Sequence, residues 1–237
     1  MKKHYSIAAI IGFMNCILGV VSSHGIPKDL SGRLLSNGYD LMSLMIGLMI
    51  FAYATYWYSL RTLKKLLINE MSVFSLNGYI NILLIMSTLM TIFGILIIQD
   101  PMQIITQPLL WMIIHFMCGI NGAIGLAIGF KIFKNQLIQW KEFRFFSVSM
   151  ILMSIPAFMM STIPLLMLMN TPDQLKLSLN EYTLLLVKVL ADYHYHFIFE
   201  AFRVLNMLTT FTLALVFLKA ARITTQESSL TSSLLHD

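Results

Sequence analysis

The sequence predicts an all-α, polytopic membrane protein: one bundle of six transmembrane helices with both termini in the cytoplasm. Of its 237 residues, 57% are apolar and only 11% are charged, and the mean hydropathy is +0.77. Soluble domains carry about 25% charged residues, so this chain cannot cover a water-exposed surface. Long apolar runs recur along the sequence, and positive charges cluster in alternate connections between them.

Six apolar runs are long enough to cross a bilayer, which takes roughly 20 residues per helix. They extend over 6–22, 41–60, 79–98, 109–130, 146–169 and 195–218. These runs form a single transmembrane domain over residues 1–225, and residues 226–237 form a polar cytoplasmic tail. Apolar residues at helical spacing within 171–193 predict a further amphipathic helix on the outer surface.

The positive charges fall into two unequal groups. The larger group contains Lys2, Lys3, Arg61, Lys64, Lys65, Lys131, Lys134, Lys141, Arg144, Lys219 and Arg222. The opposite connections contain Lys28, Arg33, Lys176 and Lys188. The positive-inside rule places the larger group in the cytoplasm, and the bacterial cytoplasmic (inner) membrane is the predicted location. The net charge of +5 therefore reflects orientation in a membrane, not affinity for nucleic acid.

The first apolar run has a second interpretation, as a signal peptide cleaved before His24. A short basic start and the small residues Val21, Ser22 and Ser23 favour cleavage. The length of the run is against it, because the apolar core of a signal peptide is usually about 7–15 residues long. We therefore expect a membrane-spanning helix here.

Small residues and prolines mark the fourth and fifth runs. The fourth contains Gly119, Gly122, Gly125 and Gly129. These glycines share less than half of the helix surface, and small residues let helices approach closely in lipid. Helix packing is the predicted role, and room for a flat cofactor is the alternative. Pro156 and Pro164 predict a kink in the fifth run.

The last run begins with a cluster of ionisable residues. Its members, spaced three or four apart on one helix face, are Asp192, His196, Glu200 and Arg203. Ionisable groups inside a membrane are costly and indicate functional sites. His194 lies beside them. His115 and Arg203 each precede a cytoplasmic lysine by sixteen residues, or about 24 Å of helix, so we expect both in the outer leaflet.

These residues suit two kinds of chemistry. The predicted metal ligands are His115, His194, His196 and Glu200. Asp192 and Arg203 are then a proton relay or charge partners. Imidazole and carboxylate groups bind transition metals, and two histidines from different helices can bind a haem axially. The same groups suit a proton relay, since histidine titrates near neutrality. The sequence does not decide whether the cofactor is haem, a transition metal or none.

The segment His196-Phe-Ile-Phe-Glu200-Ala-Phe, followed by an apolar run to Lys219, resembles one helix of the nitric oxide reductase large subunit, in the haem–copper oxidase superfamily. The resemblance implies that His196 binds a non-haem metal. It implies that Glu200 is a metal-side or proton-delivery carboxylate. It covers one helix of six. The chain has fewer spans than that family and lacks its downstream paired histidines and haem-ligand histidines, so it is not a complete reductase.

Three functions remain open, and whether the chain is an enzyme is undecided. The first is redox chemistry or metal handling at the outer-leaflet site. The second is a small proton-coupled transporter or channel, with Asn15, Asn121 and Asn206 as polar lining. The third is an accessory or assembly subunit whose partners are the lipid bilayer and other membrane subunits. Catalytic residues are not identified, because Walker, HExxH, GxSxG and CxxC motifs are absent from the sequence.

Overall fold

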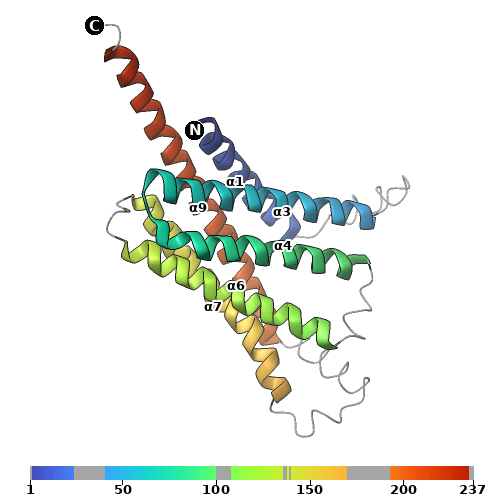
Figure 1. Cartoon of the computed structure of the whole chain (residues 1–237). Helices are drawn as coiled ribbons and strands as arrows, with labels where there is room; N and C mark the ends of the chain where they lie inside the picture. The colour runs from blue at the N-terminus through green and yellow to red at the C-terminus, as the bar shows by residue number, and fades with distance from the viewer. Residues whose placement is uncertain are drawn as a thin grey trace.

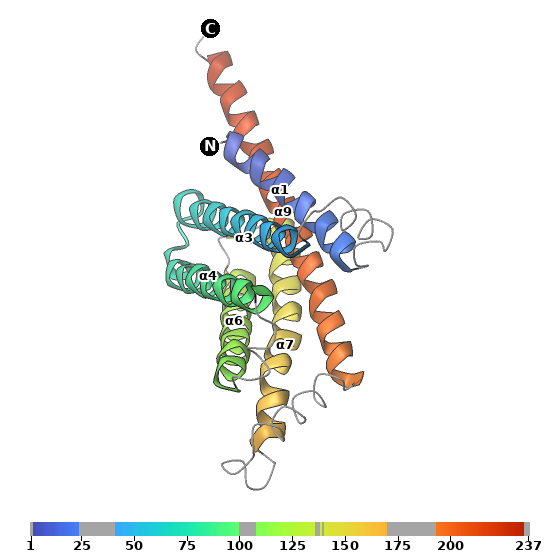
Figure 2. The ribbon, with the colours of Figure 1, turned by 90° about the vertical axis from the view of Figure 1, so that its right-hand side faces the viewer.

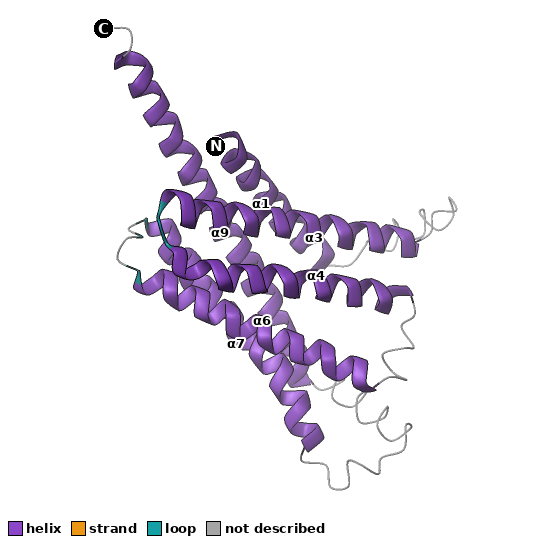
Figure 3. Ribbon diagram, in the orientation of Figure 1, coloured by secondary structure: helices purple, strands orange, loops and turns teal. Residues whose placement is uncertain are grey.

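The computed structural model describes residues 2–23, 41–99, 108–135, 138, 140–169 and 193–234. Within these ranges the only regular secondary structure is helical, which confirms the all-α part of the predicted fold class (Figures 1 and 3). The α-helices are α1 (Lys2–Ser23), α3 (Leu41–Lys65), α4 (Asn77–Gln99), α6 (Pro108–Lys134), α7 (Lys141–Met169) and α9 (Tyr193–Leu234). The amphipathic helix predicted within 171–193 lies, apart from Tyr193, outside the described residues.

Each predicted apolar run lies within one of these helices. Several helices extend beyond their runs, because a helix satisfies its own backbone hydrogen bonds in lipid and in water alike. The longest extension is in α9, whose 42 residues correspond to about 63 Å. This helix continues to Leu234, through most of the segment predicted to be a polar tail. α7 is one helix through both Pro156 and Pro164.

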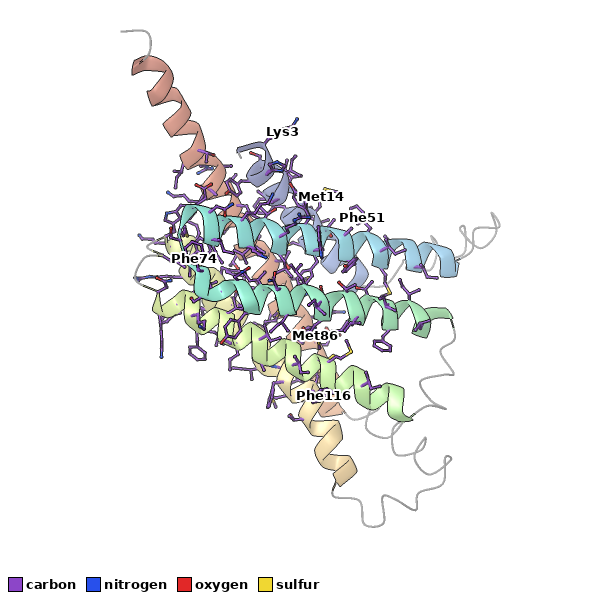
Figure 4. All side chains as sticks on the ribbon, viewed as in Figure 1. Lys3, Met14, Phe51, Phe74, Met86 and Phe116 are labelled. Carbon is purple, nitrogen blue, oxygen red and sulfur yellow. The ribbon has the colours of Figure 1, made fainter. Side chains whose placement is uncertain are left out.

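Among the described residues, four helical segments are long and apolar enough to cross a membrane. They are Phe74–Phe93, Phe116–Lys134, Lys141–Thr162 and Glu200–Thr224. Large apolar side chains on these helices and on α1 and α3 are exposed, among them Met14, Phe51, Phe74 and Phe116 (Figure 4). Such exposure is expected of helices that face lipid, because lipid tails are as apolar as these side chains and do not disfavour them at the surface. The structure therefore fits an integral membrane protein.

The helices form a ring in chain order. α6 packs against α7, α7 against α9, and α9 against α1, which closes the ring. α1 also packs against α3, α3 against α4, and α4 against α6. Figure 2 shows α3, α4 and α6 on one side of the bundle and α1 and α9 on the other. This order matters for the site, because it places α7 between α6 and α9.

Most of the described cations gather at one end of the ring, which we call the basic end. Its cations are Lys3, Arg61, Lys64, Lys65, Lys131, Lys134, Lys141, Arg144, Lys219 and Arg222. The start of α1 and both described interhelix connections lie there (Figure 1). The His4 ring lies 3.3 Å from the Tyr58 hydroxyl, and Lys131 lies 4.9 Å from the centre of the Tyr79 ring. The tertiary fold thus brings together cations that the sequence places in separate connections.

The buried core lies near the same end. It contains Leu63, Leu66, Leu67, Leu76, Ile80, Ile128, Ile132, Phe143, Phe146, Val216 and Phe217, all of which are almost fully buried. These residues come from α3, α4, α6, α7 and α9 and from the connection after α3. Ala8 and Ala9 add the contribution of α1. Among the described residues, the buried core is therefore concentrated where the cations gather.

The connection between α3 and α4 has an unusual shape. α3 ends in a π-helical turn, Leu66–Glu70, and a short 3₁₀ turn, Phe74–Leu76, leads into α4. Between them the backbone N–H of Val73 donates to the Leu67 carbonyl at 2.8 Å. Ser72 has a φ of 55°, in the left-handed region that side chains other than glycine adopt at a cost. Buried Leu66, Leu67 and Leu76 anchor this connection to the core.

The four glycines of α6 lie on the face that contacts α7. A Cβ atom on Gly122 would lie 3.1 Å from the Phe158 nitrogen and 3.2 Å from the Ser154 carbonyl oxygen. A Cβ atom on Gly119 or Gly125 would meet serine side chains, and one on Gly129 would meet Ile151 and the Ser147 carbonyl. The absence of side chains thus lets the two backbones approach closely, as small residues do in membrane helices.

Candidate functional site

The polar site at the start of α9 contains an ion pair. The Arg203 guanidinium contacts the Glu200 carboxylate one turn earlier on the same helix. The Glu200 side chain is 52% exposed and the Arg203 side chain 31% exposed. The two charges therefore neutralise each other within one helix, yet the carboxylate is still accessible from outside the bundle.

The carboxylate lies on the outward face of α9, which we define as Phe197, Glu200, Val204 and Leu208. Val204 and Leu208 are exposed, whereas Leu213 and Phe217, nine residues after each, are buried. Nine residues make about two and a half turns, so each pair lies on opposite sides of the helix. Glu200 thus lies among apolar side chains that point away from the core.

The predicted metal ligands are described only in part. His115 lies in α6, and His194 and His196 lie in the first turn of α9, but their side chains fall outside the description, as does Asp192 entirely. α9 is continuous from Tyr193, which places the backbones of His196 and Glu200 one turn apart. Among the side chains that are described, no group of three His, Cys, Asp or Glu residues could hold a metal.

Polar side chains inside the bundle connect neighbouring helices. The described pairs are Thr55 with Asn15 at 3.0 Å, Tyr53 with Thr88 at 2.8 Å, Ser149 with Thr212 at 2.9 Å, and Asn121 with the Met90 sulfur at 2.7 Å. Many hydroxyls also donate to a carbonyl of their own helix, as Ser154 does to Met150. The sequence suggested Asn15, Asn121 and Asn206 as polar lining of a transport path. In the structure Asn15 and Asn121 form contacts between helices, and Asn206 is exposed.

Sequence reasoning did not identify Tyr5 and Glu70 at the basic end. The Tyr5 hydroxyl donates to Glu70 Oε1 at 3.2 Å, and the Tyr5 side chain is 3% exposed. Burial, the Glu70 charge and this hydrogen bond all raise the pKa of Tyr5 above its ordinary value. The phenol therefore stays protonated and connects α1 to the connection after α3. Only a long-range contact across 65 residues creates this pair, so no local pattern indicates it.

No protein-family model matches the chain, and neither the curated proteins nor the solved structures contain a match to it. The resemblance of the His196–Phe202 segment to a reductase helix therefore stays a prediction. Function is inferred from the contacts of the chain's own residues.

Proposed function

We propose that the chain is an accessory or assembly subunit of a complex in the bacterial cytoplasmic membrane. All six helices cross the bilayer, and the basic end faces the cytoplasm together with both termini. The closed ring supports six crossings, because α1 packs against the apolar helix α9 and α3 packs against the apolar helix α4. The gathering of cations at one end supports the orientation, by the positive-inside rule.

The observation that carries this proposal is the Glu200–Arg203 pair on the outward face of α9. Charged side chains that face lipid tails cost free energy, even when they are paired. Membrane helices lower that cost by packing polar groups against one another. A partner helix that covers the outward face would remove the pair from lipid and give it further hydrogen bonds.

The outward face has the composition of a small helix-binding surface. Phe197 and Val204 are 67% and 54% exposed, and Leu208 lies one turn further along. Apolar side chains around a central polar pair are typical of interfaces, in which a few anchors carry most of the binding energy. The expected partner is a transmembrane helix with a hydrogen-bonding side chain at the depth of Glu200.

Photo-crosslinking in native membranes tests this proposal. A benzophenone amino acid is placed at Val204 or Leu208, and the matched controls carry it at Ile85 or Ile92, which are 59% and 50% exposed on α4. We expect discrete protein adducts from α9 and none from α4. Adducts that are equally abundant from both helices, or that are absent from α9, would reject the proposal.

A second variant tests whether the adduct depends on the Glu200–Arg203 pair. Adding Glu200→Ala to the Val204 photo-probe removes the carboxylate without altering the probe, so the adduct should weaken. An adduct with the mass of two chains, twice 27.0 kDa, would identify the partner as a second copy. An adduct of undiminished yield would show that the interface does not depend on Glu200.

A metal or haem site in the outer leaflet is the second candidate. It is favoured by the continuous helix that places the His196 and Glu200 backbones one turn apart. It ranks second because the Glu200 carboxylate already contacts Arg203, and a paired carboxylate is a weaker ligand. An absorption spectrum and elemental analysis of the purified protein test it. A colourless, metal-free and well-folded preparation would reject it.

A further inference from the structure

A groove of about 610 Å³ lies at the basic end, between the last turns of α3 and the start of α4. α3 contributes Trp57, Arg61, Lys64 and Lys65 to its walls. The π turn contributes Asn69, and α4 contributes Asn77. Turns of this π type are frequently found at functional sites. The groove lies far along the chain from the outward face of α9 and is independent of it.

Three cations line this groove, and its described lining residues include no carboxylate. Arg61, Lys64 and Lys65 form no ion pair with any described side chain. The nearest acidic residue in sequence, Glu70, accepts a hydrogen bond from Tyr5. The groove therefore concentrates positive potential that an anion can neutralise.

Neighbouring side chains hold two of these cations in position. The Arg61 guanidinium lies 5.0 Å from the centre of the Trp57 ring, as a cation–π contact. Lys64 Nζ donates to Asn81 Oδ1 at 2.7 Å. Each contact leaves the positive charge intact. The cations are thus arranged before a ligand arrives, which lowers the entropy that binding would cost.

We propose that this groove binds a phosphate group at the cytoplasmic surface of the membrane. The Arg61 guanidinium would contact two phosphate oxygens at once, and the two lysines would add point charges. Asn69 and Asn77 have amide N–H groups that can donate to the remaining oxygens. Trp57 supplies an amphipathic wall of the kind found at the headgroup level of a bilayer. An anionic phospholipid headgroup and a soluble phosphate ester share this chemistry.

The experiment compares three ligands on the full chain in neutral detergent, by the shift of its thermal unfolding midpoint. They are a short-chain phosphatidylglycerol, the phosphatidylcholine of equal chain length, and glycerol 3-phosphate. We expect phosphatidylglycerol to stabilise the protein more than phosphatidylcholine. Stabilisation by glycerol 3-phosphate as well would identify a soluble ester as a ligand, and no effect of it would identify the lipid. Equal stabilisation by both lipids, without any effect of glycerol 3-phosphate, would overturn the proposal.

A charge-matched pair of variants locates the binding. R61Q/K65Q removes two exposed cations of the groove, and K134Q/R144Q removes two exposed cations at the same end but outside it. The first should weaken phosphatidylglycerol binding by roughly thirtyfold, as expected for two cations near an anionic headgroup. The second should retain most of the affinity. Equal losses, or no loss from the first, would overturn the proposal. If R61Q/K65Q does not fold, K65Q against K134Q repeats the comparison.

Discussion

Glu200 and Arg203 show how two charges coexist in an apolar helix. They are three residues apart, so their side chains meet on one side of α9. Because both are partly exposed, the strength of the pair depends on whether lipid, water or a partner covers it. The contribution of this pair to stability therefore indicates what covers it, so substitutions of these two residues test its surroundings.

A double-mutant cycle separates structure from function at this pair. Glu200→Gln removes the carboxylate that contacts Arg203 within α9, so we expect the free energy of unfolding to fall by about 1–3 kcal/mol. Adding Arg203→Gln should recover most of that loss, since it removes the positive charge that Glu200 balanced. Thermal unfolding in detergent measures both variants and the Arg203→Gln single.

The exposed Arg222, at the basic end of the same helix, is the control. Arg222→Gln should alter the free energy of unfolding by less than about 0.5 kcal/mol, as is usual for surface sites. A double variant no more stable than Glu200→Gln would show that the ion pair does not fix the stability here. A stable double variant that loses the photo-adduct would connect Glu200 to the partner.

Among the elements, the contact between α6 and α7 depends on glycine. At Gly122 an added methyl group would meet backbone atoms of α7 at 3.1 and 3.2 Å, and a backbone cannot rotate away as a side chain can. We expect Gly122→Ala to lower the free energy of unfolding by about 1–3 kcal/mol, because the helices must separate.

Gly47 provides a control at which substitution by alanine should change the free energy of unfolding in the opposite direction. It lies inside α3, and a Cβ atom there would meet nothing within 4 Å. Gly47→Ala should therefore raise the free energy of unfolding by about 0.5–1 kcal/mol, through the helix propensity of alanine. Thermal unfolding of both variants checks the pair. Equal effects at Gly122 and Gly47 would show that the close approach is not needed.

The helices themselves could be predicted from the sequence, whereas their contacts could not. Apolar runs identify each helix because a membrane helix must be predominantly apolar where it crosses the hydrocarbon core. The glycine pattern predicted a packing face, but not that Ser154 and Ala157 of α7 lie against it. Likewise Lys64 and Asn77, thirteen residues apart, share a groove only because the chain reverses between them. Such contacts depend on tertiary structure, which local patterns do not encode.

Across the whole molecule, the ring order and the gathered cations constrain how the protein lies in a membrane. Each helix runs roughly antiparallel to the next helix along the chain, so successive helices begin at alternate ends of the bundle (Figure 1). The positive charges follow that alternation.

Membrane sidedness is the last prediction. In a background without Cys16 and Cys118, Lys141→Cys lies at the start of α7 and Asp173→Cys lies in the connection before α9. An impermeant maleimide should label position 173 in intact cells and position 141 only after the membrane is opened, if the basic end faces the cytoplasm as we propose. Labelling of both positions from one side would contradict an odd number of crossings between them, and so the six-span bundle. Labelling of 141 from outside and 173 from inside would keep the bundle but invert it, and the phosphate groove would then face away from the cytoplasm.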